Sequence, residues 1–544
     1  MKLAPALAGS DAKTALKRWL VPTGTDSVLP LAEGIKKINS PCYLVANDSC
    51  YTTGTALLGE TTPPADALQL EAFVAPLRLE DLGNPGFCSD LGICYPVMGG
   101  SMAKGISSIA MVEALGKAGM LGFFGAAGLP LPQVEAAIVA LKSQLGNLPF
   151  GFNLIHSPNE PDLEEALVDL YIRHQVRLIE ASAFLSLTLP LVRFRVHGIH
   201  RDSAGNIVTP NRVIGKISRE ELAAKFLAPP PAKLLQELVR RGDITKEQAE
   251  LAEQIPVAQD ITAEADSGGH TDNRPALALY PTIAALRDSQ QQLFPHLPLR
   301  VGLAGGIGTP EAAAAAFSLG ADYIVTGSVN QACVESGTSD AVRQMLAETR
   351  QADVTMAPAA DMFEMGVKVQ VLKRGTMFSM RAAKLYELYR AYDSIEALPA
   401  DERQKIETTF FHTSLEEIWQ ATRTYFLQRD RKQVERAERD PKYRLALVFR
   451  WYLGQAPHWA NNGDANRKMD YQVWCGPAMG AFNEWCRGSF LDDPKQRNVA
   501  TVNFNLLYGA ALVLRLGALR RQGVVLPPVK IQPQNIADIK EYLF

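Results

Sequence analysis

Short apolar runs alternate with helical patterns over the middle of the chain, from about residue 93 to about residue 355. This alternation is typical of parallel βαβ units, in which buried strands are joined by amphipathic helices. The runs that qualify as strands are Tyr95–Met98, Gly122–Ala126, Phe150–Ile155, Leu178–Ala183, Val213–Ile217, Ile261–Ala265, Arg300–Ala304 and Tyr323–Thr326. Eight parallel strands close a (β/α)8 barrel, whereas a doubly wound sheet normally has fewer strands. The pattern therefore predicts a TIM barrel, with a doubly wound sheet as the alternative.

Two of the predicted connecting helices have clear signals at their ends. Before the last strand, Thr309 is a suitable N-cap, Pro310 fits the first helical turn and Gly320 ends the helix. After the first strand, Met111–Ala118 continues as a helix and stops at Gly119. These signals support the alternation of strands and helices that a barrel requires.

Two regions depart from this alternation. Residues from about 190 to about 258 contain a turn signal, Asp202–Asn206, between two β-like arms, and then helical sequence around three prolines. We interpret this region as an insertion between strands four and six, formed by a hairpin and a pair of helices. After about residue 360 the pattern is mainly helical, most clearly at Phe378–Tyr392, Leu415–Gln433 and Val502–Leu519. We therefore predict an N-terminal arm or cap, a barrel and a helical lid or substrate region, with bounds 1–75, 76–358 and 359–544.

Composition restricts the possible function. Hydrophobic residues make up 47% and charged residues 21% of the chain, as in ordinary globular proteins, and a net charge of −3 argues against nucleic acid as a partner. The N-terminus lacks an apolar run long enough for a secretory signal, and Asn505–Ala518 is interrupted by Arg515 and too short to span a bilayer. The 7 cysteines show no C-x-x-C spacing, which predicts reduced thiols and no zinc site. We expect a cytoplasmic protein.

Glycines follow both of the last two predicted strands. Gly305 and Gly306 come after one strand, and Gly327, followed by Ser328, comes after the next. The carboxyl ends of neighbouring barrel strands lie side by side, and there backbone amides and a hydroxyl can together satisfy a phosphate. A single glycine pair often does no more than end a strand. Two such pairs on consecutive strands, with a capped helix between them, favour a phosphate site.

Other positions are predicted to reach the same end of the barrel. Gly99 and Gly100, after the first strand, permit close approach of a flat ligand, and Asn153 offers a donor and an acceptor after the third. His270 closes a Gly-Gly-His corner after the sixth strand, where an imidazole can donate a proton or polarise a carbonyl. The alternative for His270 is a structural hydrogen bond. The sequence offers no Rossmann G-x-G-x-x-G site, no Ser/His/Asp triad and no metal-ligand cluster.

The motifs MGGSMAKG (98–105), DSGGH (266–270), AGGIG (304–308) and TGS (326–328) occur together in this chain. In this combination they resemble the nitronate monooxygenase and flavin-dependent enoyl reductase superfamily of FMN barrels. Longer segments, such as RVIGKISREELAAKFLAPPP and PAADMFEMGVKVQVLKRGTMFSMRAAKLYELY, resemble the PfaD-type trans-acting enoyl reductases of polyunsaturated fatty acid and polyketide synthases. The resemblance covers nearly the whole chain and is weakest over the first 75 residues.

The resemblance implies a bound FMN, a nicotinamide co-substrate (NADPH, with NADH as the alternative) and an enoyl thioester carried by an acyl carrier protein. Hydride then passes from the nicotinamide through the flavin to the β-carbon, and His270 or water protonates the α-carbon. The residues for which FMN contacts are implied are Met98, Gly99, Asn153, Gly305, Gly306, Gly327 and Ser328. Further candidates for cofactor binding are Gly100, Lys216, Asp266, Ser267 and Gly269.

Two other functions share the same barrel motifs. A nitronate monooxygenase would pass flavin electrons to oxygen, and a non-catalytic docking subunit would keep the barrel as a scaffold, although the intact glycines and His270 argue against that. A carrier protein is usually acidic, so basic residues of the insertion are candidates for its docking surface: Arg193, Arg195, Arg201 and Arg212. Members of the superfamily often dimerise, so a homodimer is expected by analogy.

Overall fold

The chain forms two compact units in a computed structural model that describes residues 18–23, 28–45, 49–58, 63–158, 160–526 and 530–543. One unit contains residues 1–82 and 505–544, and the other contains residues 83–504. The sequence suggested a different division, into an arm, a barrel and a C-terminal helical region. Residues 1–17, on which the expectation of no secretory signal depends, lie outside the described residues.

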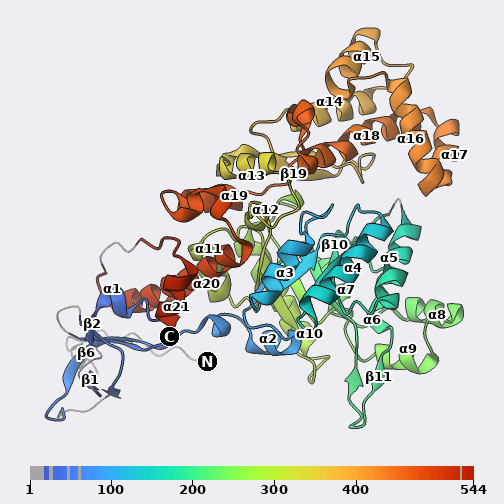
Figure 1. Ribbon diagram of the computed structural model, residues 1–544. Helices are drawn as coiled ribbons and strands as arrows, with labels where there is room; N and C mark the ends of the chain where they lie inside the picture. Colours follow the sequence, from blue (N-terminus) through green and yellow to red (C-terminus); the bar gives the residue numbers. More distant parts are fainter. Residues whose placement is uncertain are drawn as a thin grey trace, which may run out of the picture. The chain divides into compact units, whose positions relative to one another are not determined.

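A closed barrel of eight parallel strands forms the centre of the larger unit (Figure 1), which confirms the predicted fold. Every strand lies within two residues of its predicted position. Around the barrel the order is β10–β13–β14–β16–β17–β7–β8–β9. The strands are β7 Val97–Gly99, β8 Leu121–Phe124, β9 Gly151–Ile155, β10 Leu178–Ser182, β13 Arg212–Ile217, β14 Asp260–Glu264, β16 Arg300–Ala304 and β17 Ile324–Thr326.

Helices surround this barrel, and one more packs near the amino ends of its strands. The helices that connect the strands are α3 Ile109–Lys117, α4 Leu131–Leu145, α5 Pro161–Arg173, α6 Leu189–Val196, α7 Glu220–Phe226, α10 Ala276–Gln291 and α11 Pro310–Ser318, with α12 Ser328–Gln331 and α13 Asp340–Ala347 after the last strand. As predicted, α11 begins at its N-cap Thr309, whose hydroxyl accepts from the backbone of Ala312. The additional helix is α2 Pro85–Leu91, where Phe87 stacks on Tyr323 in the core.

The predicted insertion is confirmed as a hairpin and two helices. Strands β11 His200–Arg201 and β12 Ile207–Val208 pair antiparallel, and Asp202 accepts backbone hydrogen bonds from the turn between them. Helices α8 Ala232–Arg241 and α9 Lys246–Ala252 follow β13 and α7. Their apolar residues pack with those of α6 in a separate small core. The insertion therefore lies beside the barrel helices and leaves the barrel closed.

The region after the barrel is mainly helical, as predicted, but it starts with a small sheet that the sequence did not reveal. In this sheet, β15 Gly269–His270 pairs with β19 Lys368–Leu372, which pairs in turn with β18 Val354–Pro358. The following helices share a second large core with the sheet. They are α14 Phe378–Ala391, α15 Ala400–Ile406, α16 Leu415–Arg429, α17 Arg431–Arg439 and α18 Pro441–Asn462, followed by α19 Ala478–Cys486.

The smaller unit is built on a six-stranded antiparallel sheet, which the hydrophobic pattern did not predict. Its strands are β1 Arg18–Val21, β2 Val28–Pro30, β3 Cys42–Val45, β4 Ser49–Tyr51, β5 Thr55–Leu58 and β6 Leu68–Val74, with α1 Leu31–Gly34 after β2. Its C-terminal segment supplies the later part of α20 Val499–Arg521 and then α21 Ile536–Leu543. Leu516 and Leu519 of α20 pack with apolar residues of β3 and β6.

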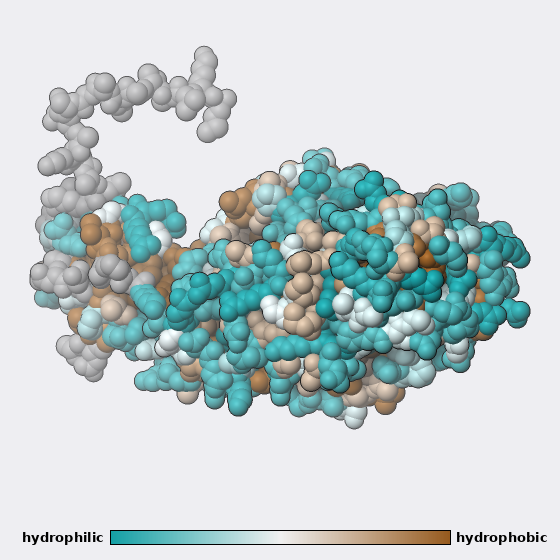
Figure 2. All heavy atoms as spheres, turned by 90° about the horizontal axis from the view of Figure 1, so that it is seen from above, coloured by the Kyte–Doolittle hydropathy of each residue, from teal (hydrophilic) through white to brown (hydrophobic). Residues whose placement is uncertain are grey.

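Helix α20 is longer than the apolar run in the sequence suggested. By length and composition it is the one helix of the described residues that could cross a membrane, but 72% of its most apolar window is buried within the protein. Buried core helices commonly have this composition. Its Arg515 is buried and donates hydrogen bonds to the carbonyls of Ile38, Ser40 and Ala75. The space-filling view shows a mostly hydrophilic face with small apolar patches (Figure 2).

Candidate active site

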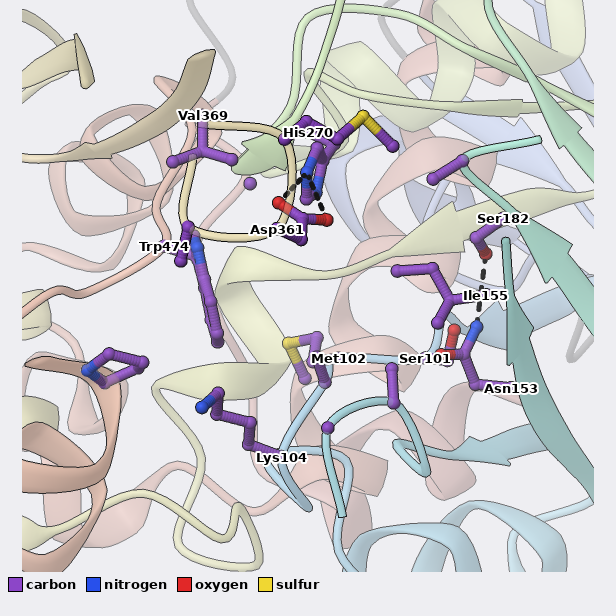
Figure 3. Close-up of a pocket in the computed structure, with 18 of the residues that line it drawn as sticks. Ser101, Met102, Lys104, Asn153, Ile155, Ser182, His270, Asp361, Val369 and Trp474 are labelled. Carbon is purple, nitrogen blue, oxygen red and sulfur yellow. Dashed lines mark hydrogen bonds and ion pairs between the residues drawn. The ribbon is translucent and has the colours of Figure 1, made fainter. Parts of the chain in front are cut away.

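A cavity of about 990 Å³ lies at the carboxyl ends of the barrel strands and is walled on its other side by the helical region (Figure 3). The strand ends are where TIM barrels usually carry their active sites. Most of the predicted site residues line this cavity: Gly100, Asn153, Lys216, Asp266, Ser267, Gly269, His270, Gly305, Gly306, Gly327 and Ser328. The structure therefore brings together residues from six of the eight strand ends.

Met98 and Gly99 lie outside the cavity wall. Met98 is fully buried in the barrel core, and a Cβ at Gly99 would lie 2.3 Å from a Leu115 side-chain atom. Gly99 is therefore required by packing against α3. Gly100, whose amide donates to the carbonyl of Thr326, is the first residue of this loop at the cavity. The implied flavin contacts of Met98 and Gly99 stay a prediction.

The glycine loops after β16 and β17 have the properties that a phosphate-bearing cofactor requires. Gly305 and Gly306 adopt φ of +85° and +79°, a conformation that glycine favours. A Cβ at Gly305 would lie 2.6 Å from the carbonyl carbon of Ala265, whereas the space beside Gly306 is open. Gly327 precedes α12, whose first amides have no partner within the helix. This uncovered backbone at the cavity wall fits the phosphate of FMN.

Ser328 and Asn153 add polar side chains to the same wall. Ser328 Oγ accepts from the amide of Gly476 at 3.1 Å, so its own proton remains available to a ligand. Asn153 is buried on β9, and its amide donates to the Ser182 hydroxyl at 3.2 Å and the Glu180 carbonyl at 3.3 Å. These bonds hold the Asn153 carboxamide in one orientation at the edge of the cavity (Figure 3).

Three charged side chains meet at the barrel end of the cavity. Lys216 Nζ lies 3.6 Å from both Glu180 Oε2 and Glu264 Oε1, and Glu180 is fully buried. Burial opposes the charge on Lys216, but the two carboxylates outweigh it and raise the lysine pKa. Burial also raises the pKa of Glu264, against the attraction of Lys216. Lys216 therefore holds a positive charge at this end of the cavity at neutral pH, and its contact with a cofactor stays a prediction.

His270 is paired with an aspartate that the sequence did not indicate. Its Nε2 lies 3.1 Å from Asp361, which belongs to the turn between β18 and β19 (Figure 3). Burial disfavours the imidazolium, but the charge and hydrogen bond of Asp361 outweigh this and raise the pKa of His270. Burial alone would raise the pKa of Asp361, but the charge and hydrogen bond of His270 outweigh burial and lower it. A larger fraction of His270 is therefore protonated at neutral pH than in a free histidine, as a proton donor requires.

The Asp-Ser-Gly-Gly-His corner is held by the small sheet. Asp266 accepts from the amides of Asn273 and Gln370, each at 2.8 Å, and the Ser267 carbonyl also accepts from Gln370. A Cβ at Gly268 would lie 2.8 Å from the backbone of Cys475. These contacts fix the backbone that carries His270. The side chain of Asp266 acts here within the protein, and its contact with a cofactor stays a prediction.

The cavity is also lined by residues that sequence reasoning missed: Lys104, Glu264, Asp361, His458 and Trp474. Glu180, also missed, is buried behind the wall, where it contacts Lys216 and Ser101. Most of their contacts join distant parts of the chain; His270 and Asp361, for example, are 91 positions apart. Lys104 and Asp361 lie inside motifs that carried the family resemblance, which was the available signal. Spacing alone gives no indication of such pairs.

The basic residues proposed for carrier docking do not form one exposed surface. Arg195 is 1% exposed and donates to the carbonyls of Pro256 and Asn211. Arg193 pairs with Asp169 and Asp243. Arg195 is therefore a structural residue, and the prediction that it forms part of a docking patch was wrong. Of this set, Arg201 is exposed, at the tip of the β11–β12 hairpin.

Comparison with known proteins identifies the family. Residues 87–404 match the family model described as "Nitronate monooxygenase", which covers the barrel and the cavity motifs. The chain belongs to the nitronate monooxygenase family. Residues 392–471 also match the model described as "[Acyl-carrier-protein] S-malonyltransferase, inserted helical domain", which covers α15 to α18.

Several relatives of this family member resemble it over most of its length. A polyunsaturated fatty acid synthase subunit of Thraustochytrium sp. is 48% identical over 86% of this chain, and polyketide biosynthesis protein PksE of Bacillus subtilis is 46% identical over 81%. The solved enoyl reductase domain of MlnA, from the macrolactin biosynthesis cluster of Bacillus amyloliquefaciens, is 40% identical with a TM-score of 0.77. The match covers 82% of this chain and all of that domain. The chain spans 32% of the Thraustochytrium protein and 57% of PksE.

Proposed function

We propose that this protein is an FMN- and NAD(P)H-dependent enoyl reductase that reduces the trans-2 double bond of enoyl thioesters carried by an acyl carrier protein. It would act in trans, as a partner of a polyunsaturated fatty acid or polyketide synthase. The observation that carries the proposal is the match to the MlnA enoyl reductase domain over that domain's full length and 82% of this chain. The synthase proteins among the relatives support the pathway.

One group of cavity residues would bind the cofactor, and a second group would transfer a proton. The Gly305–Gly306 and Gly327–Ser328 loops would hold the FMN phosphate, and Lys216 would place a positive charge beside the ring system. When bound, FMN supplies the hydride, obtained from NAD(P)H, that goes to the β-carbon of the enoyl thioester. The helical wall would exclude water and hold the substrate over the cofactor.

His270 would supply the proton that completes the reduction. Addition of hydride to the β-carbon leaves an electron pair on the α-carbon and the thioester carbonyl, and the imidazolium of His270 donates a proton to that α-carbon. Asp361 keeps His270 protonated and oriented through the 3.1 Å contact. The neutral imidazole regains its proton from solvent before the next turnover. The net change is one hydride and one proton added across the double bond.

Stopped-flow absorbance on the purified protein tests this proposal. We expect NADPH to bleach the flavin absorbance rapidly and a crotonyl thioester to restore it under anaerobic conditions. The product should be the butyryl thioester. Flavin colour that returns with oxygen and a nitronate, and not with the enoyl thioester, would refute enoyl reduction. A colourless protein that cannot be reconstituted with FMN would instead support a docking subunit.

The second candidate function is nitronate monooxygenase activity. The match of residues 87–404 to that family model favours it, because the same barrel motifs serve both reactions. The helical region from 392 to 471 matches a model described for a malonyltransferase of acyl carrier proteins, which favours a carrier-bound substrate. Oxygen consumption with propyl-2-nitronate, compared with anaerobic reduction of the enoyl thioester, separates the two candidates.

A further inference from the structure

Lys104 is an enclosed cation of the cavity that lacks a carboxylate partner. It lies in the loop between β7 and α3, and its Nζ approaches the carbonyl of Gly454 at 3.1 Å and Nε2 of His458 at 2.9 Å, both on α18. Within the described part of the chain, no carboxylate oxygen lies within 4.0 Å of this ammonium. An ammonium has three donors, so one N–H remains for a ligand in the cavity.

The other enclosed cations of the cavity wall are balanced by carboxylates. The pairs are Lys216 with Glu180 and Glu264, Arg450 with Glu364, and His270 with Asp361. Two exposed arginines of the wall are paired as well, Arg219 with Asp272 and Arg429 with Glu160. Among the described lining residues, Lys368 also lacks such a pair, but it is exposed to solvent. Lys104 therefore differs from its neighbours in being both enclosed and uncompensated.

The backbone fixes Lys104 in an uncommon conformation. Its φ is +57°, in the left-handed region that residues with a side chain rarely adopt, and its amide donates to the carbonyl of Ala127 at 2.7 Å. Such backbone strain often accompanies functional positions. The side chain starts from a fixed point on the barrel, and His458 on the helical wall holds its far end. Little conformational freedom remains to be lost when a ligand binds.

The charges around Lys104 favour an anion at this position. The groups that face it are His458 on α18, Arg429 on α16 and Asp361 in the β18–β19 turn. Burial, and then Arg429, lower the pKa of Lys104 to about 8, with Asp361 acting in the opposite direction. Burial, and then Lys104, lower the pKa of His458 to about 4, so His458 is a neutral acceptor near pH 7. An anion bound here would favour the protonated lysine.

We propose that Lys104, positioned by His458, binds a phosphate group of the ligand that enters the cavity beside the cofactor. This inference rests on the proposed function, which supplies two such ligands. One is the 2′-phosphate of NADPH, and the other is the phosphate of the pantetheine arm on the carrier protein. The FMN phosphate is expected at the Gly305–Gly306 and Gly327–Ser328 loops, which belong to other strands.

Isothermal titration of the FMN-loaded protein with small probes tests the site directly. The probes are 2′-AMP against adenosine, and phosphopantetheine against pantetheine. We expect Lys104→Met to reduce the affinity for one phosphate-bearing probe at least tenfold and to leave the affinity for its phosphate-free counterpart unchanged. Lys104→Arg should keep most of the affinity because it keeps the charge. Lys368→Met is the matched control, since Lys368 lines the same cavity without being enclosed, and it should change neither probe.

Kinetics with the corresponding full ligands give a second measurement. For the wild type, the KM of the ligand that uses this site, NADPH or crotonyl-phosphopantetheine, should rise as pH increases through about 8, because only the ammonium attracts phosphate. The KM of NADH or crotonyl-pantetheine should not show this rise. In Lys104→Met the difference within each pair should disappear, and flavin content and melting temperature confirm that the variant is folded.

Three results would overturn the inference. Lys104→Met could leave the affinity for all four probes unchanged, or could reduce the affinity for both members of a pair equally. It could also lower kcat with every KM unchanged, which would assign Lys104 to the chemical step. Failure of the proposed function is distinguishable from these. A wild type whose flavin is not reduced by NAD(P)H refutes the reductase, whereas the titrations report on the phosphate site independently of turnover.

Discussion

At the residue scale, the site depends on how charge is balanced in an enclosed space. Burial opposes ionisation of both His270 and Asp361, and their contact reverses that effect for both. A raised histidine pKa means that the proton is present at low pH and lost as pH rises through the raised value. Activity that uses this proton should therefore fall on the alkaline side, at a pH that Asp361 sets.

Replacement of Asp361 by asparagine tests this dependence. Without the carboxylate, burial remains as the main influence and the pKa of His270 falls, so the alkaline limb of kcat against pH should move about one unit or more toward lower pH. Asp272→Asn is the matched control, because Asp272 lines the same cavity but pairs with Ser218 and Arg219. An unmoved limb in Asp361→Asn would show that His270 does not supply the proton.

At the element scale, the sequence predicts what is local and misses what joins distant segments. Each barrel strand is a buried run between turn signals, so apolar pattern alone located all of them. By contrast, β15 has only two residues, Gly269–His270, and exists because β19, about a hundred positions later, pairs with it. The His270–Asp361 contact depends on this pairing. The glycine loops follow their strands directly in the sequence, so they could be predicted. Asp361 reaches His270 only through pairing between distant segments, so this acidic partner could not be predicted.

The loop after β16 offers a test of the expected phosphate site. Gly306→Ala places a methyl group beside uncovered backbone, and we expect FMN affinity to fall about tenfold or more, the equivalent of one hydrogen bond to a charged group. Gly242→Ala, at the end of α8, is a closely matched control. The φ of Gly242 is +77° and that of Gly306 is +79°, and an added Cβ would have open space at both positions. Both variants should lose similar stability, and only Gly306→Ala should lose flavin on dialysis. Equal flavin retention would contradict the assignment.

At the scale of the whole molecule, the described residues between 18 and 82 and between 505 and 543 belong to one compact unit, while the residues that line the cavity all belong to the other. Sequence order concealed this, because residues 1–82 and 505–544 are joined by contacts between distant segments. Arg515 is central to them: three backbone carbonyls from the N-terminal segment accept its hydrogen bonds in a buried setting. Stability of this unit and chemistry in the cavity should therefore respond to different substitutions.

Replacement of Arg515 by methionine tests whether the smaller unit can lose stability while the larger unit keeps its flavin. The variant leaves the carbonyls of Ile38, Ser40 and Ala75 without this donor, at a cost of about 1–3 kcal/mol for each one left unpaired. We expect earlier thermal unfolding and faster proteolysis within 1–82 and 505–544, with unchanged flavin content. Arg520→Met, on the exposed last turn of the same helix, should have little effect. Parallel loss of flavin and of protease resistance in Arg515→Met would mean that the two units unfold as one.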